Sequence, residues 1–207
     1  MSSKEIVFSL PFNGTWLTFW GGDTAKQNHH HGSQSQQYAF DFIKMDDSDN
    51  FFRTNGNSNE DYFSFGLDIL APADGKIVEL VNGLRDNKPR ELNSLNFIGN
   101  YIMIKHDETT YSILGHLKQD SMTVKAGDMV ISGEKLALCG NSGNTTDPHL
   151  HFHVQDSDIF AKVNTDNEIV DVAKGKKVYF SRIIVSKTRK SNYSPVKGDK
   201  VSNITNS

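Results

Sequence analysis

The sequence contains a single cysteine, no long apolar run and no excess of basic residues. One cysteine excludes an intrachain disulfide, and we interpret Cys139, in LALCGNSG, as a small buried residue. No apolar run approaches the length of a membrane span. The formal net charge of −3 gives no basic field that would favour nucleic acid or an anionic membrane. We therefore expect neither as a partner.

A secretory signal is also missing from the first residues, MSSKEIVFSLPFNG. Ser9, Pro11 and Asn13 interrupt the apolar run, and no small-residue cleavage site follows it. From the sequence we expect a cytoplasmic protein. Action outside the cell or in the cell wall would then require lysis or export without a leader.

Helical periodicity is nearly absent, whereas short runs rich in β-branched and aromatic residues recur between Gly, Asn and Asp turn signals. The strands that we expect are 5–10, 38–43, 75–81, 100–106, 110–117, 134–140, 150–155 and 177–185. This pattern predicts an all-β fold of antiparallel sheets. We assign residues 1–157 to the main β domain and 158–207 to a β-rich extension packed on it. The extension ends in a frayed tail from residue 202.

Histidines alternate with apolar residues in TTDPHLHFHVQD, residues 145–156. His149, His151 and His153 therefore share one face of a half-buried strand. A solvated face would more simply use Lys, Glu or Thr, whereas neutral imidazole is the commonest metal ligand in proteins. The alternation indicates a metal or catalytic site whose other ligands lie elsewhere in the chain.

Further candidate ligands lie upstream of this strand. Asp41 lies in YAFDF, on the opposite strand face from Phe40 and Phe42. A carboxylate on a hydrophobic strand needs a partner, which a metal, a salt bridge or a turn contact would supply. The segment NHHHG offers three histidines, at positions 29, 30 and 31. His116, at the end of an apolar strand, would by itself more often be a core or surface residue.

Several segments together resemble the lysostaphin-type (LytM-like) zinc metallopeptidases. They are GLDILAPADGKIVELVNG, Gly-His-Leu at 115–117 and VKAGDMVISGEKLALCGNSGNTTDPHLHF, and the resemblance covers roughly residues 20–155. The pattern of recurring glycines in residues 124–143 also occurs in biotinyl and lipoyl carriers and in sugar-phosphotransferase domains. It therefore indicates architecture rather than function. We expect a duplicated-hybrid-motif (barrel-sandwich hybrid) architecture. The resemblance implies that His151 binds Zn²⁺ and that His149 and His116 are catalytic.

The sequence departs from the family's usual His-x-x-x-Asp element. Gln37 stands four residues before Asp41, and Ser64 stands four residues before Asp68 in GLDILAP. The chain looks like a subgroup in which a longer loop carries the histidine. We therefore expect the metal ligands His30, Asp41 and His151, with His31 and then His29 as alternatives to His30, and Asp68 as the less favoured carboxylate. His153 stands where the family often has Glu, and it either contacts the site or faces solvent.

Together with these residues, the resemblance implies a zinc-dependent endopeptidase that hydrolyses amide bonds, and we expect it to be a monomer. Its peptidoglycan substrate is implied by the resemblance alone. His149 and His116 would take a proton from water, hold the oxyanion or return a proton, and the sequence does not divide these roles. One alternative is a non-catalytic module that binds peptidoglycan or a partner protein. Another is a phosphohistidine carrier that uses His116 and His149 without metal, which would leave Asp41 and His151 without a purpose.

Overall fold

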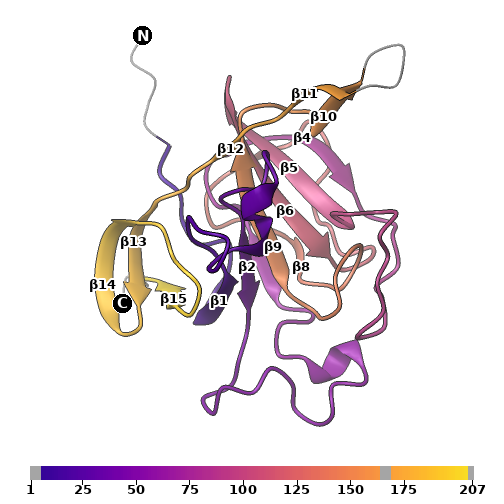
Figure 1. Cartoon of the computed structure of the whole chain (residues 1–207), viewed down its shortest axis with the longest axis vertical. Helices are drawn as coiled ribbons and strands as arrows, with labels where there is room; N and C mark the ends of the chain where they lie inside the picture. Colours follow the sequence, from indigo (N-terminus) through magenta and orange to yellow (C-terminus); the bar gives the residue numbers. More distant parts are fainter. Residues whose placement is uncertain (1–5, 164–168, 205–207) are drawn as a thin grey trace.

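The computed structural model describes residues 6–163 and 169–204, and its regular structure is almost entirely β (Figure 1). Two short 3-10 turns are present, η1 (His29–Gly32) and η2 (Asn59–Asp61). The strands are β1 (Trp16–Trp20), β2 (Phe40–Ile43), β3 (Asp68–Leu70), β4 (Gly75–Val81), β5 (Asn100–Asp107), β6 (Thr110–Leu117), β7 (Met129–Val130), β8 (Lys135–Leu138), β9 (Leu150–Gln155), β10 (Ala161–Val163), β11 (Ile169–Val172), β12 (Gly175–Lys176), β13 (Phe180–Val185), β14 (Thr188–Tyr193) and β15 (Lys200–Asn203). These strands pair antiparallel throughout, which confirms the predicted all-β class.

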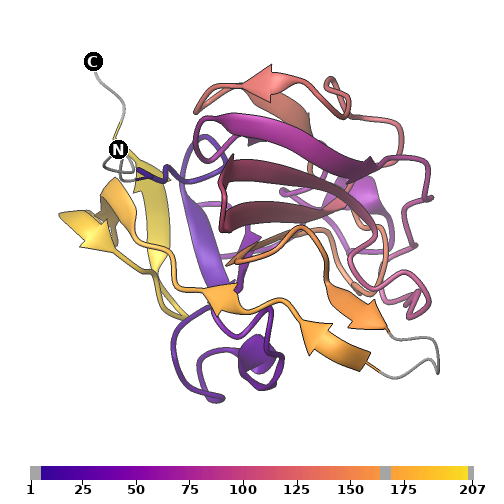
Figure 2. The same ribbon diagram turned by 90° about the horizontal axis from the view of Figure 1, so that it is seen from above.

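One large sheet has the strand order β14-β13-β15-β1-β2-β9-β6-β5-β4-β7, and β12 pairs with β9 beside it. Two small sheets, β10-β11 and β3-β8, complete the fold. In Figure 2 the yellow C-terminal strands lie beside β1, away from the magenta strand β4. Strands β2 and β9 are therefore central in the sheet. Within the described residues, no helix is long and apolar enough to cross a membrane.

Seven of the predicted strand ranges overlap an observed strand, namely β2, β4, β5, β6, β8, β9 and β13. The strand predicted at 5–10 is wrong for its described residues, which contain only a bridge between Phe8 and Phe180. The Ser9 N–H donates to the Pro72 carbonyl, whereas the Leu10 N–H donates to the side chain of Asn203. Because this segment bonds to separate parts of the chain, it has no single partner strand.

The prediction that the tail is frayed from residue 202 is wrong for its first two residues. Ser202 and Asn203 belong to β15, which pairs with both β1 and β13. The Asn203 amide also donates to the carbonyls of Leu10 and Phe12. These contacts hold the chain in place as far as Asn203, and residues 205–207 of the predicted tail lie outside the described residues.

The register of β2 against β9 positions the polar residues of both strands. Phe40 pairs with Phe152, and Phe42 pairs with Leu150, on the face that packs into the main core. The Phe40 ring centroid lies 5.4 Å from that of Phe42 and 6.3 Å from that of Phe152. A slip of one residue would turn these apolar side chains off the core, each at a cost of about 1.5–3 kcal/mol. The same register places Asp41 opposite His151, with both side chains on the other face.

Candidate metal centre

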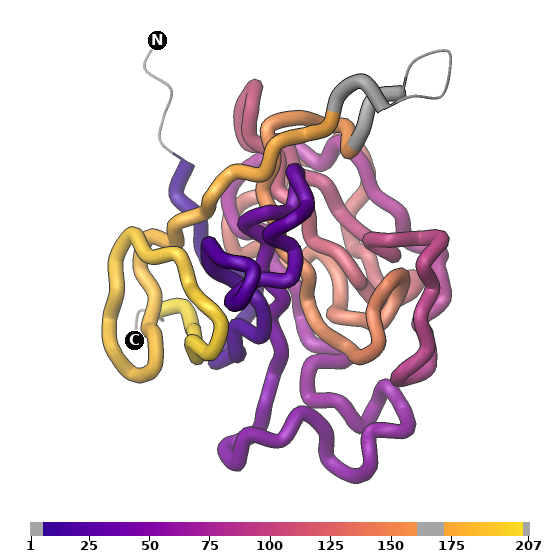
Figure 3. The backbone as a smooth tube through the Cα atoms, in the orientation of Figure 1, coloured from indigo at the N-terminus to yellow at the C-terminus, as the bar shows by residue number. Residues whose placement is uncertain are grey.

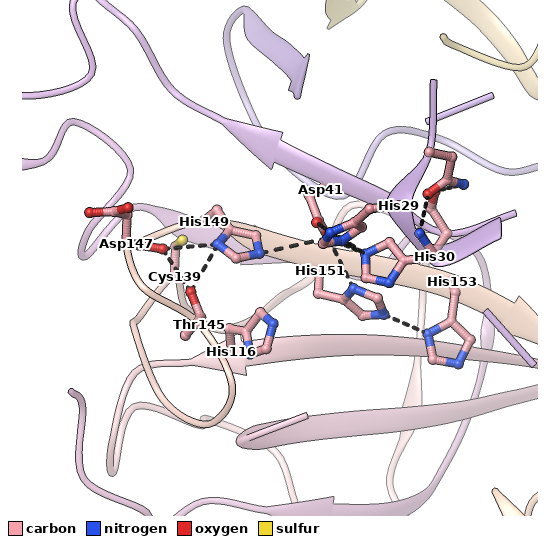
Figure 4. A network of polar contacts seen from close by, with 12 residues as sticks. His29, His30, Asp41, His116, Cys139, Thr145, Asp147, His149, His151 and His153 are labelled. Atoms are coloured by element: carbon pink, nitrogen blue, oxygen red, sulfur yellow. Dashed lines mark hydrogen bonds and ion pairs between the residues drawn. The ribbon is translucent and has the colours of Figure 1, made fainter. Parts of the chain in front are cut away.

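The carboxylate of Asp41 lies between four imidazole rings (Figure 4). Nε2 of His30 lies 3.1 Å from Oδ1 and 3.0 Å from Oδ2, and Nδ1 of His151 lies 3.0 Å from Oδ1. Nε2 of His29 lies 3.2 Å from Oδ2, and Nε2 of His149 lies 3.7 Å from Oδ1. Burial alone would raise the pKa of Asp41, but the charges of His30 and His149 hold that pKa well below its ordinary value.

A buried asparagine brings η1 to the carboxylate. The Asn28 side chain accepts a hydrogen bond from the His30 backbone N–H at 3.0 Å. Its amide nitrogen donates to the carbonyls of Gln37 at 3.2 Å and Ala39 at 3.0 Å, just before β2 begins. Asn28 therefore joins the histidine turn to the start of the strand that carries the carboxylate. This link replaces the tight sequence spacing that the chain lacks.

The amide of Gln155 has a single possible orientation. Its Nε2 donates to the carbonyl oxygens of Ser157 at 2.8 Å and Ile159 at 3.3 Å. The amide oxygen consequently faces Nε2 of His153, at 3.2 Å. Because that oxygen can only accept a hydrogen bond, His153 carries its proton on Nε2. His153 is 1% exposed, so it does not face solvent.

The proton on His153 in turn sets the tautomer of His151. Burial lowers the pKa of His153 to about 4 and that of His151 to about 3, so both rings are neutral near pH 7. Nδ1 of His153 then accepts a hydrogen bond from Nε2 of His151, at 2.9 Å. His151 is left with a lone pair on Nδ1, directed at Oδ1 of Asp41. Two lone pairs repel at 3.0 Å unless a cation lies between them, so these atoms form a candidate cation site.

Two sets of three donors share His30 and Asp41. The third donor is buried His151 in one set and exposed His29 in the other, where all donor atoms lie within 4.8 Å of one another. Ligands about 2.0–2.1 Å from a four-coordinate zinc ion lie roughly 3.4 Å apart. The distances of 3.0–3.1 Å from His30 and His151 to the Asp41 carboxylate are close to this value. We favour the set with His151, because its strand pairing and its contact with His153 fix the ring.

His149 lies beside this donor set with its proton directed away from it. Nδ1 donates to the Asp147 carbonyl at 2.9 Å and lies 3.1 Å from the Thr145 hydroxyl, so Nε2 faces Asp41. Burial by itself lowers the pKa of His149. The charge and hydrogen bond of Asp41, together with the Asp147 carbonyl, outweigh burial and raise that pKa.

His116 lies next to His149, with ring centroids 4.8 Å apart. Its Nδ1 donates to the Ser142 carbonyl at 2.9 Å, which leaves a lone pair on Nε2. Burial, followed by the charges of His149 and His151, lowers the pKa of His116 well below its ordinary value. The His116 ring is therefore neutral, with its proton on Nδ1.

A cleft of about 730 Å³ opens over these groups. Aromatic and apolar side chains form much of its wall, and they include Phe19, Trp20, Phe51, Phe52, Tyr62, Leu92, Phe97 and Ile98. Residues 46–62, a polar segment that follows β2, contribute three of these side chains and project from the sheet (Figure 3). Phe51 and Phe52, adjacent aromatics in a polar segment, are the sequence signal for this wall.

The alternative carboxylate lies elsewhere. Asp68 is exposed at the start of β3, and its Oδ1 lies 2.6 Å from Nζ of Lys135. His31 is exposed on η1 and does not belong to the group of His29, His30 and Asp41. Of the predicted site residues, the structure thus brings together His30, Asp41, His116, His149 and His151.

A model of peptidase family M23 matches residues 61–172. An uncharacterized metalloprotease of Haemophilus influenzae is 34% identical over 93 residues, which are 44% of this chain and 17% of that protein. The peptidoglycan DD-endopeptidase ShyA of Vibrio cholerae is 30% identical over 98 residues, 47% of this chain and 20% of that protein. The murein hydrolase activator NlpD of Escherichia coli is 35% identical over 92 residues, 44% of this chain and 21% of that protein.

The match thus spans about a fifth of the length of these curated relatives. Among solved structures, the catalytic domain of lysostaphin from Staphylococcus simulans matches 79% of this chain and 88% of its own. Its sequence identity is 18% and its TM-score is 0.41.

Proposed function

This chain belongs to peptidase family M23, and we propose that it is a zinc-dependent endopeptidase that hydrolyses amide bonds in peptidoglycan peptides. The observation that carries the proposal is the lone pair of His151 Nδ1, directed at the Asp41 carboxylate 3.0 Å away. For the neutral ring with its proton on Nε2, a cation between the two atoms makes that contact attractive. The metal that the relatives named as metalloproteases imply therefore has a matching donor set in this chain.

His30, Asp41 and His151 would hold the ion, with two neutral imidazoles and one carboxylate. Zn²⁺ bound there would supply a Lewis acid that activates water and polarises the scissile carbonyl. Nitrogen and carboxylate ligands are typical of zinc, and three protein ligands are typical of a catalytic site. His153 and Gln155 hold the His151 ring in the orientation that binding requires.

We assign the role of general base to His149. In the neutral form of His149, Nε2 presents a lone pair 3.7 Å from Oδ1 of Asp41, within reach of a water between them. Proton uptake at Nε2 would leave an imidazolium whose Nδ1–H remains bound to the Asp147 carbonyl. The same contact orients the ring before and after the transfer.

His116 has a more restricted role. The Ser142 carbonyl keeps its proton on Nδ1, so Nε2 can accept a hydrogen bond from the attacking water. It can stabilise an oxyanion or donate to the leaving amine only after it takes up a proton. We therefore propose that His116 orients the water beside His149 and acts as a donor later in the reaction.

The substrate class is supported by relatives named as peptidoglycan DD-endopeptidases and by the cleft. A peptide lying along the cleft would place a backbone carbonyl near the donor set and its side chains against the aromatic wall. Peptidoglycan as the substrate implies action on the cell wall.

Metal content tests the proposal most directly. We expect about one zinc per chain by elemental mass spectrometry for the wild type and for Asp68→Ala, and no zinc for Asp41→Ala. Asp41→Asn keeps the shape of the side chain and separates loss of ligand charge from loss of packing. The zinc-loaded wild type should release peptides from purified peptidoglycan. Zinc retained by Asp41→Ala but lost by Asp68→Ala would overturn the ligand set.

The similarity to a murein hydrolase activator supports a second candidate function, a non-catalytic activator module. This reading predicts that the wild type releases no peptides even when it is loaded with zinc. It further predicts that adding the protein raises the rate of a separate murein hydrolase. The Asp41→Ala variant would then stimulate that hydrolase as well as the wild type does.

A further inference from the structure

His29 contacts two of the three proposed metal ligands, although it is not itself one of the three. Its Nε2 lies 2.7 Å from Nε2 of His30 and 3.2 Å from Oδ2 of Asp41. Nε2 of His30 lies 3.0 Å from the same carboxylate oxygen. Three polar atoms therefore form a triangle at the mouth of the site, and each lies within hydrogen-bond distance of the other two.

No arrangement of protons makes all three contacts of this triangle attractive. The carboxylate of Asp41 can only accept. If His29 and His30 both carry a proton on Nε2, two N–H groups face each other at 2.7 Å. If either nitrogen is deprotonated, its lone pair faces the carboxylate. A cation shared by the three atoms, with His29 as one of its ligands, removes the conflict.

The His29 ring is also held from the side away from the site. It stacks on Trp20 with centroids 5.0 Å apart and an interplanar angle of 5°. Trp20 pairs with Asp41 across β1 and β2, so this stack has a fixed position relative to the carboxylate. The ammonium group of Lys197 lies 3.4 Å from the Trp20 ring centroid and helps to hold the indole. The orientation of His29 is thus built into the fold rather than left to a free loop.

Exposure distinguishes His29 from the other donors. Its side chain is 52% exposed, against 11% for His30 and 3% for His151. It also lines the cleft from which a substrate would enter. Among the donors, His29 is therefore the one that can leave without disturbing the core.

We propose that His29 is a fourth, exchangeable protein ligand that completes the coordination of the zinc ion in the resting protein. It moves aside when a peptide carbonyl or a water enters from the cleft. Closed sites with four protein ligands are typical of structural zinc, whereas catalytic sites keep one position open. The inference rests on the proposed zinc site, and it adds that the resting chain is latent until His29 leaves.

The test compares His29→Ala with His31→Ala, a change of the same residue type on the same 3-10 turn. X-ray absorption at the zinc edge counts the imidazole ligands. We expect the wild type and His31→Ala to give the same imidazole count and His29→Ala to give one fewer. The zinc dissociation constant, measured against a chromophoric chelator, should rise roughly 10–100-fold in His29→Ala alone.

A second readout uses acetohydroxamate, a small chelating probe of an open zinc position. It should bind zinc-loaded His29→Ala more tightly than the wild type, because no protein ligand has to be displaced. Equal imidazole counts, zinc affinities and acetohydroxamate affinities in the two variants would overturn the role of His29 and leave the three-ligand site standing. A wild type that binds no zinc would overturn both.

Discussion

Nε2 of His153 lies 3.2 Å from the amide oxygen of Gln155, and this contact sets the tautomer of a ring two residues further back on β9. Both side chains are buried, so water does not replace either partner readily. The Ser157 and Ile159 carbonyls orient the Gln155 amide. Through His153, that amide determines which nitrogen of His151 faces Asp41. A residue outside the cleft thereby determines which nitrogen of a proposed ligand is free to bind.

We expect Gln155→Leu to weaken zinc binding while the fold is retained. Without the amide oxygen, His153 can move its proton to Nδ1, and His151 loses the acceptor for its Nε2–H. The zinc dissociation constant should rise roughly 10–100-fold, as when a ligand loses its outer hydrogen-bond partner. Val154→Ala, a buried change on the other face of β9, is the control and should leave zinc affinity unchanged. Equal affinities in both variants would contradict the relay.

Local alternation accounts for most of what the sequence predicts about the site. Period two places His149, His151 and His153 on one face and isolates Asp41 from its neighbouring phenylalanines. The choice between His29 and His30 depends instead on Asn28, whose side chain bonds to backbone groups nine and eleven residues away. Such contacts have no signature in local spacing, so the sequence leaves the first ligand open.

Long-range pairing limits the prediction of the fold in the same way. β1 pairs with β15, which lies far from it in the sequence. The segment WLTFW in β1 has no alternation of polar and apolar residues that would predict a strand. The sequence does not predict the aromatic wall of the cleft, because the loop after β2 is mostly polar. Phe52 bridges to Tyr62 across that loop, and both residues line the cleft.

Tyr62 should stabilise the loop that carries His149. Its hydroxyl donates to Oδ1 of Asp147 at 2.5 Å, and Asp147 in turn accepts from the His149 ring through its carbonyl. Tyr62→Phe leaves a carboxylate oxygen without this donor, and a hydrogen bond to a charged group contributes about 1.5–3 kcal/mol. We expect a loss of that size in urea unfolding. A loss below about 0.5 kcal/mol, the usual range for surface changes, would contradict this assignment.

Gly99 should be essential to the geometry of His116. Its φ is +70°, and a Cβ at this position would lie 2.1 Å from the Ser142 carbonyl oxygen, the acceptor for His116 Nδ1. Gly127 is the matched control, since its φ is +98° and a Cβ there would meet no atom within 4 Å. Both alanine variants should lose roughly 1–2 kcal/mol from left-handed backbone strain.

Only Gly99→Ala should also displace Ser142 and reduce the rate of peptide release. Unfolding curves and release rates of the two variants, both loaded with zinc, separate the two effects. Equal release rates would show that the close approach of Gly99 to Ser142 has no bearing on His116.

His106, which lies apart from the donor set, should contribute to the pH dependence of stability. Burial lowers its pKa, and its hydrogen bond to the Asp74 carbonyl and the charges of Asp107 and Asp74 only partly oppose this. Between the lowered pKa of the folded state and the ordinary value of about 6.5, the unfolded chain binds more protons, so the free energy of unfolding rises with pH. The contribution is complete above about pH 6.5 and is lost as the pH falls toward the folded-state pKa.

His106→Gln removes the titrating group. We therefore expect the difference in unfolding free energy between the wild type and this variant to become smaller as the pH falls below about 6.5. Urea unfolding of chelator-treated protein across this range measures the difference, and the values at pH 8 supply the cost of the substitution itself. A difference that stays constant with pH would mean that His106 titrates alike in the folded and unfolded chains. The wild type's loss of stability in acid would then arise from its other buried histidines, among them His151 and His153, whose pKa values burial also lowers.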